Sequence, residues 1–381
     1  MNLRLTEEEH LIKNTVREFA ERQLAPKASY WDEMEEFPWE NIAGLSDLGL
    51  MGLTIGDECD GSGGTYRQLA IVVEELARCC AATSLIYLAH LSLGTSTLYR
   101  FGNSEQRQRL VPHLASGKKI AAWALTEPEA GSDATNLLTS ANKGNGGYKI
   151  NGTKVFVTNG DVADTLVIFA TQEHTTRSKG ILSLVVEKGT PGMDIVKQKG
   201  KMGMRGSSTA EIVFQDCHVP ETNLIGEEGN GFKIAMQILD TSRISIAAQS
   251  VGMAQAALES ALRYSRERHA FGRPIADLAA IQGSIADMAT KIEAARLLTT
   301  QAATLVDMGL KHGQESSMAK LFSSEIAMEC ANRALQIHGG YGYFKPNSVE
   351  RLFRDARVAQ IYEGTSEIQR LVIARHILAT M

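Results

Sequence analysis

The sequence has 381 residues, of which 44% are hydrophobic and 22% charged. This length and composition exclude a disulfide-stapled miniprotein or a largely disordered chain, and two or three domains are expected. A net charge of −5 without a basic block argues against nucleic-acid binding. The five cysteines lack zinc-site spacing, and the N-terminus has no signal or transit pattern, so no metal and a cytoplasmic protein with reduced thiols are predicted.

The first part of the chain has helical patterning. Thr6 and Glu9 have the spacing of a capping box ahead of an apolar periodic run. Residues 69–99 are strongly apolar with a predicted break near Gly94, and the polar residues among them indicate buried helix rather than a membrane span. A further helix is expected over residues 105–115.

Short β-rich segments follow in the middle of the chain. Residues 148–158 alternate polar and apolar side chains around Asn151-Gly152, a pair that predicts a type I′ hairpin turn. More strands of a sandwich or barrel are expected at residues 165–171, 180–187, 193–197 and 210–214.

Helical patterning returns after about Pro220. Four long helices are predicted to form a bundle, at residues 232–266, 278–308, 315–338 and 348–362. Ser366 and Gln369 have the spacing of a capping box for a short terminal helix.

The predicted fold is therefore multidomain α+β. A helical domain is expected over residues 1–120, a β domain over 121–228 and a helical bundle over 229–381. This arrangement alone does not indicate one chemistry.

Common catalytic fingerprints are absent from the sequence. The glycines at 61–64 and 229–231 lack the third glycine and the preceding strand of a dinucleotide motif. GxxxxGK[ST], HExxH and GxSxG do not occur either. The sequence therefore disfavours a Rossmann nicotinamide site, a P-loop, a metalloprotease and a serine hydrolase.

Four segments at predicted boundaries are candidate sites, each with a plain structural alternative. Residues 126–133 join two domains, where ligands often bind, or are only a connector. Glu363 lies between two helices, where its carboxylate faces a cleft or is simply solvated. Residues 336–340 end a helix with two glycines that expose amides to a phosphate or only stop the helix. A basic turn would hold a pyrophosphate or be solvated, and contains Arg266, Arg268, Phe271 and Arg273.

Seven segments, in order and across essentially the whole chain, resemble the acyl-CoA dehydrogenase family. They are TEPEAGSDA at 126–134, KVFVTNG at 154–160, KMGMRGSSTAEIVFQDCHVP at 201–220, GNGFKIAMQILDTSR at 229–243, RHAFGRPI at 268–275, ALQIHGGYGY at 334–343 and IYEGTSEIQRLVIARHIL at 361–378. The sequence is most similar to short-chain (butyryl-type) and short-branched-chain members, with cyclic acyl-CoA dehydrogenases as near relatives. The resemblance implies a helical N-terminal domain, a β-barrel-like middle domain and a C-terminal four-helix bundle, with FAD at the domain cleft and assembly as a homotetramer.

The resemblance also implies site residues. Contacts to FAD would come from Trp123, Leu125, Thr126, Ser132, Phe156, Thr158, Arg268, Phe271, Gln336, Gly339, Gly340, Thr365 and Glu367. Of these, Arg268, Phe271 and residues 336–340 would reach the FAD of a neighbouring subunit. The acyl-CoA would meet Ser132, Asp240, Arg243, Tyr362 and Gly364.

Glu363 matches the family's catalytic base. It would remove the α-proton of the thioester while the β-hydride passes to flavin N5, leaving a 2-enoyl-CoA. In the family, the amide of this residue and a flavin ribityl hydroxyl polarise the thioester carbonyl. The resemblance implies an electron-transferring flavoprotein as electron acceptor.

Two alternatives to a dehydrogenase remain at this point. An acyl-CoA oxidase would let oxygen reoxidise the flavin, but the extra C-terminal domain usual in oxidases is not expected in a chain ending at Met381. A non-catalytic flavin or CoA-binding scaffold is disfavoured by the intact YEGTSEIQ motif at 362–369.

At two positions this sequence has a different residue from relatives in the family. Ala279 stands where family members commonly have a glutamine that contacts FAD. Ser84 stands near the position of an arginine in glutaryl-CoA dehydrogenases, which argues against dicarboxylic substrates. The acyl group itself depends on packing around residues 85–93, which the sequence does not fix.

Overall fold

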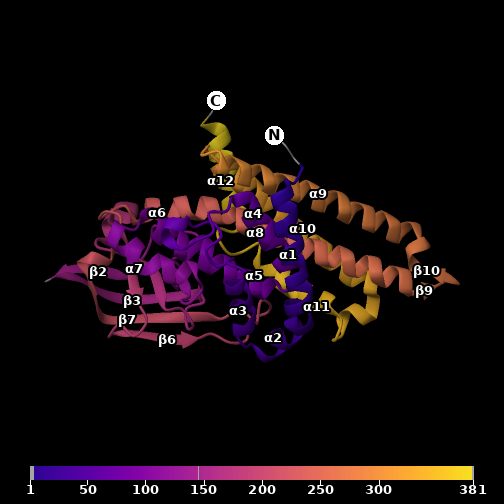
Figure 1. The fold of residues 1–381 in the computed structure, drawn as a ribbon, viewed down its shortest axis with the longest axis horizontal. Helices are drawn as coiled ribbons and strands as arrows, with labels where there is room; N and C mark the ends of the chain where they lie inside the picture. Colours follow the sequence, from indigo (N-terminus) through magenta and orange to yellow (C-terminus); the bar gives the residue numbers. More distant parts are fainter. Residues whose placement is uncertain (1–3, 145, 380–381) are drawn as a thin grey trace.

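The computed structural model describes residues 4–144 and 146–379 and is drawn in Figure 1. An N-terminal helical domain, a central sheet and a C-terminal helical domain follow one another along the chain. This confirms the predicted α+β class. The sheet lies at one end of the molecule, and the long C-terminal helices extend from it to the other end (Figure 1).

The N-terminal helices surround a continuous apolar core. They are α1 (Glu7–Phe19), α2 (Ala28–Met34), α3 (Trp39–Asp47), α4 (Tyr66–Cys79), α5 (Ala81–Leu88), α6 (Ser96–Phe101) and α7 (Ser104–Ala115). The predicted capping box is confirmed: the Thr6 side chain accepts from the Glu9 amide, and the Glu9 side chain accepts from the Thr6 amide.

The predicted break near Gly94 is wrong. The apolar stretch breaks at Cys80, whose backbone is extended, and Gly94 lies inside a π-helical segment, Ala89–Thr95. A Cβ on Gly94 would lie 2.6 Å from the Cβ of Ala121. This glycine therefore serves close packing of the helix on the first strand rather than a helix stop.

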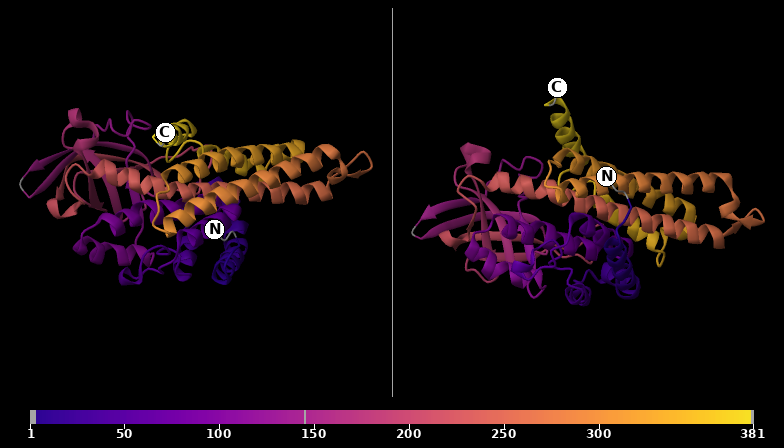
Figure 2. Two further views of the ribbon diagram at one scale, coloured as in Figure 1. Left: turned by 90° about the horizontal axis from the view of Figure 1, so that it is seen from above. Right: turned by 45° about the horizontal axis from the view of Figure 1, so that its top comes forward.

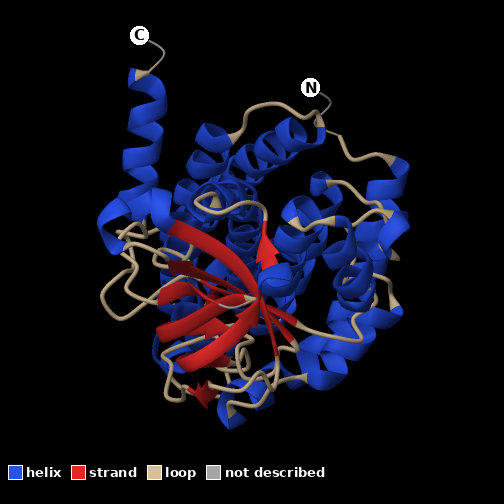
Figure 3. Cartoon of the chain, turned by 90° about the vertical axis from the view of Figure 1, so that its left-hand side faces the viewer, coloured by secondary structure: helices blue, strands red, loops and turns tan. Residues whose placement is uncertain are grey.

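Within the described residues, the central sheet contains eight strands. They are β1 (Ala121–Ala124), β2 (Ser140–Gly144), β3 (Gly147–Thr158), β4 (Thr165–Thr171), β5 (Ile181–Glu187), β6 (Met193–Lys197), β7 (Thr209–Pro220) and β8 (Leu224–Ile225). Their order is β6-β7-β3-β2-β4-β5-β8, and β1 pairs in parallel with β4. Figure 3 shows this sheet curving with helices packed beside it.

The predicted hairpin at Asn151-Gly152 is also wrong. Strand β3 runs through both residues, and its register against β7 shifts between Ile150 and Gly152, as at a β-bulge. Gly152 has φ 144°, and a Cβ there would lie 2.6 Å from the Thr139 Cα. The pair marks a bulge with close backbone approach.

The C-terminal domain consists of α8 (Gly231–Glu267), α9 (Ala279–Asp307), α10 (Gly313–His338), α11 (Ser348–Val358) and the terminal α12 (Ser366–Leu378). The short strands β9 (His269–Ala270) and β10 (Arg273–Pro274) form the turn between α8 and α9. Helix α12 contacts α10 at its start, where the Ser366 hydroxyl donates to Glu325, and its C-terminal end projects from the bundle (Figure 2).

The predicted end of α11 and the predicted cap of α12 need correction. Helix α11 ends at Val358 rather than near Tyr362, and a turn follows in which the amides of Ile361 and Tyr362 both donate to the Val358 carbonyl. Glu363 and Gly364 then have positive φ values of 50° and 93°, which separate this turn from α12. The N-cap of α12 is Thr365, whose hydroxyl accepts from the Ile368 amide at 3.3 Å. Ser366 is already the first residue of the helix.

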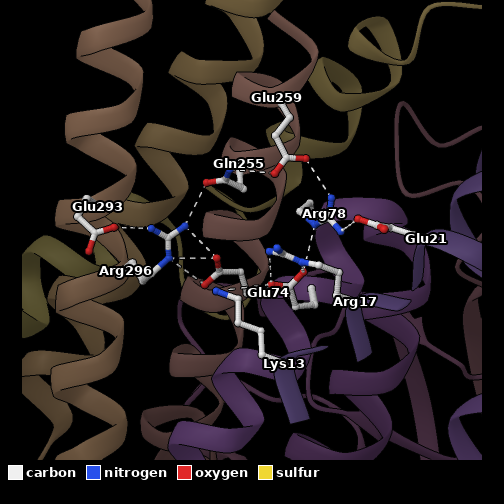
Figure 4. A network of polar contacts seen from close by, with 10 residues as sticks. Lys13, Arg17, Glu21, Glu74, Arg78, Gln255, Glu259, Glu293 and Arg296 are labelled. Carbon is white, nitrogen blue, oxygen red and sulfur yellow. Dashed lines mark hydrogen bonds and ion pairs between the residues drawn. The ribbon is translucent and has the colours of Figure 1, made fainter. Parts of the chain in front are cut away.

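Ion pairs join the N-terminal domain to the bundle (Figure 4). Arg296 on α9 contacts Glu74 on α4 at 2.9 Å, and Arg78 on α4 contacts Glu259 on α8 at 3.0 Å. These contacts connect α4 of the N-terminal domain to α8 and α9 of the bundle. None of the described helices has the length and apolar character that a membrane crossing requires.

Candidate active site

A cavity of about 470 Å³ lies where the three domains meet. Apolar side chains from α5, the π-helical segment, α8 and α12 form much of its wall, together with the ends of β1 and β3. Its volume is in the usual range for small-molecule sites. The predicted residues that line it are Trp123, Leu125, Thr126, Ser132, Phe156, Thr158, Arg243, Tyr362, Glu363 and Gly364.

Glu363 reaches the cavity from the turn between α11 and α12. The Ser242 hydroxyl on α8 donates to Glu363 Oε2. Gln369 Nε2 donates to the carbonyls of Glu363, at 3.2 Å, and Gly364, at 3.0 Å. A residue with a Cβ rarely adopts a φ of +50°, so these contacts hold Glu363 in a strained conformation that directs it inward.

Burial raises the pKa of the Glu363 carboxyl from 4.5 to about 7. The Ser242 hydrogen bond and the positive charges of Arg243 and Lys320 oppose this rise. A carboxyl group with a pKa near neutrality is suited to take up and release a proton at working pH.

Asp240 does not line the cavity but lies beside it. Arg243 Nη1 donates to Asp240 Oδ1 at 2.6 Å, and Arg243 is nearly fully buried. The Tyr362 hydroxyl donates to Gln249 Oε1, and Gln249 Nε2 donates to the Ala81 carbonyl at 3.1 Å. This chain of contacts links the Glu363 turn to the start of α5, a helix of the cavity wall.

A buried ion pair supports the β1 side of the cavity. Lys154 Nζ lies 2.6 Å from Glu127 Oε1 and donates to the Leu125 carbonyl at 3.0 Å. The Glu127 carboxylate also accepts from the amides of Leu138 and Thr139. Sequence reasoning gave Lys154 and Glu127 no role, although the lysine's inward place on the alternating strand was a possible signal.

Trp123 and Phe156 both line the cavity, but the indole N–H of Trp123 is buried and Phe156 is largely exposed. Trp123 packs edge-on against Phe169, and its indole N–H, although buried, has no hydrogen-bond partner among the described residues. Phe156 has φ 58° and is 70% exposed. An unpaired buried donor costs free energy unless a ligand satisfies it, so this wall is suited to a planar ring with acceptor atoms.

Other predicted residues lie far from Glu363. Arg268, Gly339 and Gly340 line an open hollow of about 720 Å³. Phe271, 90% exposed, lies in the β9–β10 turn, at the end of the bundle opposite the sheet (Figure 1). Gln336, near the end of α10, is exposed as well. One chain therefore does not bring these residues to the cavity.

Thr365 and Glu367 flank the Glu363 turn without lining the cavity. Thr365 caps α12, and Glu367 is exposed in its first turn. The described residues contain no group of three or more His, Cys, Asp or Glu side chains placed to hold a metal.

One carboxyl group of near-neutral pKa, facing a largely apolar cavity between domains, is the arrangement of an enzyme that removes a proton from a largely apolar substrate. The chain matches the family models for the acyl-CoA dehydrogenase N-terminal domain at residues 6–118, the middle domain at 122–217 and the C-terminal domain at 229–378. It therefore belongs to the acyl-CoA dehydrogenase family.

Similar proteins cover almost the whole chain. A short-chain specific acyl-CoA dehydrogenase of Clostridium acetobutylicum is 45% identical, over 99% of this chain and 100% of the relative. The solved structure of butyryl-CoA dehydrogenase from Megasphaera elsdenii is 39% identical with a TM-score of 0.97, covering 99% of this chain and 100% of the other. A structure described as the electron transferring flavoprotein of Acidaminococcus fermentans is 42% identical with a TM-score of 0.97, over 99% of this chain and 100% of that one.

Proposed function

We propose that Glu363 is the base in the dehydrogenation of a short-chain, branched or cyclic acyl-CoA. As a member of its family, the chain is an oxidoreductase that converts acyl-CoA to enoyl-CoA with FAD as cofactor. The observation that carries the proposal is the position of Glu363, held by Ser242 at an apolar cavity with a pKa of about 7. No other Asp or Glu except Asp133 lines the described part of this cavity.

The residues of the cavity fit the cofactor. FAD, when bound, supplies the acceptor for the hydride that leaves the β-carbon. Trp123, Leu125, Thr126, Ser132, Phe156 and Thr158 would hold it on the β side. The unpartnered indole N–H of Trp123 supports this assignment because a flavin has ring nitrogens and oxygens that accept hydrogen bonds.

Glu363 accepts the α-proton in this proposal, and its backbone amide donates to the thioester carbonyl. The apolar wall excludes water, which strengthens that hydrogen bond and raises the carboxyl pKa toward that of the activated carbon acid. Tyr362 and Gly364 flank the thioester, while Asp240 and Arg243 meet the CoA portion. Ser132, on the loop that follows β1, would contact both FAD and the acyl-CoA.

Oxidation by an electron-transferring flavoprotein, rather than by oxygen, is the proposed second half of the reaction. This acceptor is the one that the family resemblance implies, and the description of the similar Acidaminococcus structure links the fold to electron-transferring flavoproteins only in general terms. A cytoplasmic location remains a prediction from sequence; all five cysteines are free in the structure.

The chain length of the substrate can be tested directly. Leu85, Leu88 and Leu93 line the apolar side of the cavity, and similar proteins are named short-chain specific acyl-CoA dehydrogenase and butyryl-CoA dehydrogenase, so we expect a higher kcat/KM with short or compact acyl groups than with long straight ones. Straight, branched and cyclic acyl-CoA thioesters assayed with an artificial electron acceptor measure this. A preference for long straight chains such as palmitoyl-CoA would contradict the proposed substrate class.

We further propose a homotetramer in which Arg268, Phe271 and residues 336–340 complete the FAD site of a neighbouring subunit. Arg268, Gly339 and Gly340 line a hollow separate from the Glu363 cavity, and the β9–β10 turn that contains Phe271 lies at the end of the bundle opposite the sheet, so a second chain has to bring these residues to the cavity. Dilution followed by light scattering and flavin fluorescence tests the assembly. A monomer that keeps its FAD would contradict it.

Arg268→Ala should lower FAD affinity about 10- to 100-fold, because a charge-assisted hydrogen bond to pyrophosphate contributes about 1.5–3 kcal/mol. The ratio of flavin to protein after gel filtration gives the result. Arg266→Ala is the matched control, since Arg266 is exposed nearby but does not line the hollow. Equal FAD retention by both variants would make Arg268 part of a solvated basic turn.

A further inference from the structure

We propose that Lys320 on α10 is a positioning residue for the reaction: its ammonium group holds the turn that carries Glu363 and favours the charged form of the Glu363 carboxylate. The proposed transfer of the proton and the hydride does not itself involve this lysine. The inference rests on the proposed function of Glu363 as the base.

The contact of Lys320 with the turn is direct. Its side chain is fully buried, and Nζ donates to the Gly364 carbonyl at 2.7 Å. The Gln369 side chain, from α12, donates to the same carbonyl and to that of Glu363. The turn between α11 and α12 is therefore held from two helices, at the two residues that have positive φ.

Holding a carbonyl does not require a charge, since the neutral Gln369 amide does so. A buried ammonium group is costly to desolvate, and burial lowers the pKa of Lys320 to about 8. The negative charge of Glu363 opposes that decrease, and the positive charge of Lys320 in turn opposes the rise of the Glu363 pKa. At pH values between about 7 and 8 each group is at least half charged, so the two charges stabilise each other.

Arg243 is the other buried cation near Glu363, but its charge is partly neutralised. Arg243 forms an ion pair with Asp240 at 2.6 Å, whereas no carboxylate of the described residues lies within ion-pair distance of Lys320. The uncompensated charge on this side of the turn is therefore that of Lys320.

Other ionisable groups surround the pair on each neighbouring element. They are Asp240 and Arg243 on α8, Glu325 on α10, Asp355 on α11, Tyr362 in the turn, Glu367 and Arg375 on α12, and Asp133 across the cavity. All of them remain unchanged when Lys320 alone is replaced, so a change in the titration of Glu363 reports on this lysine.

The test compares Lys320→Gln and Lys320→Met, which remove the charge, with Lys320→Arg, which keeps it. The readout is the pH dependence of flavin reduction by butyryl-CoA under anaerobic conditions, at low substrate concentration, with FAD content measured for each variant. Gln and Met should shift the ascending limb upward by about 1 pH unit, making the reaction about fivefold slower near pH 7 and nearly equal to wild type above about pH 9. Arg should leave the limb within about 0.3 unit of wild type.

Lys201→Met is a matched control. Lys201 is a half-buried lysine whose pKa is also lowered to about 8, and its Nζ donates to the Ser207 carbonyl rather than to a carbonyl of the Glu363 turn. A general structural defect from replacing a buried or half-buried lysine would appear in this variant too. We expect Lys201→Met to leave the ascending limb of the pH profile unshifted.

An unshifted limb in FAD-loaded Lys320→Gln, or equal shifts in the Gln and Arg variants, would overturn the role of Lys320. If Lys320→Met does not fold, the comparison of Gln with Arg still decides. Neither result would affect Glu363 as the base. That proposal fails only if Glu363→Gln remains active.

Discussion

Replacing Glu363 with Gln should reduce turnover by at least about 10²–10⁴-fold, while FAD content and acyl-CoA binding stay near those of the wild type. The amide has nearly the same shape as the carboxyl group, so packing in the cavity should persist, but an amide does not accept the α-proton at working pH. A loss beyond this range is consistent with the reaction, since the α-proton of a thioester is very weakly acidic.

Steady-state turnover with an artificial electron acceptor measures the effect, and flavin absorbance measures FAD content. Glu105→Gln is the control because Glu105 is exposed on α7, outside the cavity. Equal turnover of the two variants would show that another group removes the proton.

Lys154→Met should destabilise the protein by about 3–5 kcal/mol, because it leaves the buried Glu127 carboxylate without its cation. The variant should also bind FAD less tightly, because Lys154 holds the Leu125 carbonyl beside Thr126 at the cavity wall. Thermal unfolding, followed by circular dichroism and by release of flavin, measures both effects.

The same strand offers a control for Lys154→Met. Lys149 is exposed on β3 and pairs with the exposed Asp216, so Lys149→Met should change stability by less than about 1 kcal/mol. Adding Glu127→Gln to Lys154→Met should recover part of the stability, because the glutamine is uncharged but still accepts from the Leu138 or Thr139 amide. Equal unfolding of the Lys149 and Lys154 variants would contradict the role of the buried pair.

The order of helical and β-rich segments could be predicted from hydrophobic periodicity because it is a local property of the chain. The cap at Thr6 and Glu9 and strand β4 are local in this sense. The wrong predictions at Gly94 and Asn151-Gly152 have one cause: a glycine that permits close packing has the same sequence signal as one that ends a helix or makes a turn. The sequence does not distinguish Thr365 from Ser366 as the cap of α12, because both have hydroxyl side chains.

The site was harder to predict from the sequence than the fold, because its residues are brought together by tertiary contacts. Spacing alone left Glu363 as either a cleft residue or a solvated one, and only the resemblance singled it out. Its contact with Ser242 spans 121 positions of the sequence, and that of Lys320 with Gly364 spans 44. Such contacts carry no local signal, which is why the roles of Lys154 and Lys320 emerged only from the structure.

The most direct test of Glu363 as the base is a single anaerobic mixing experiment. Wild-type enzyme and the Glu363→Gln variant, each loaded with FAD, are mixed with excess butyryl-CoA, and flavin absorbance is followed in a stopped-flow instrument. Without oxygen or another acceptor, the signal reports only the reductive half of the reaction. We expect the wild-type flavin to bleach and the variant to stay yellow, although it binds the same ligand. Bleaching of the variant at the wild-type rate would show that Glu363 is not the base.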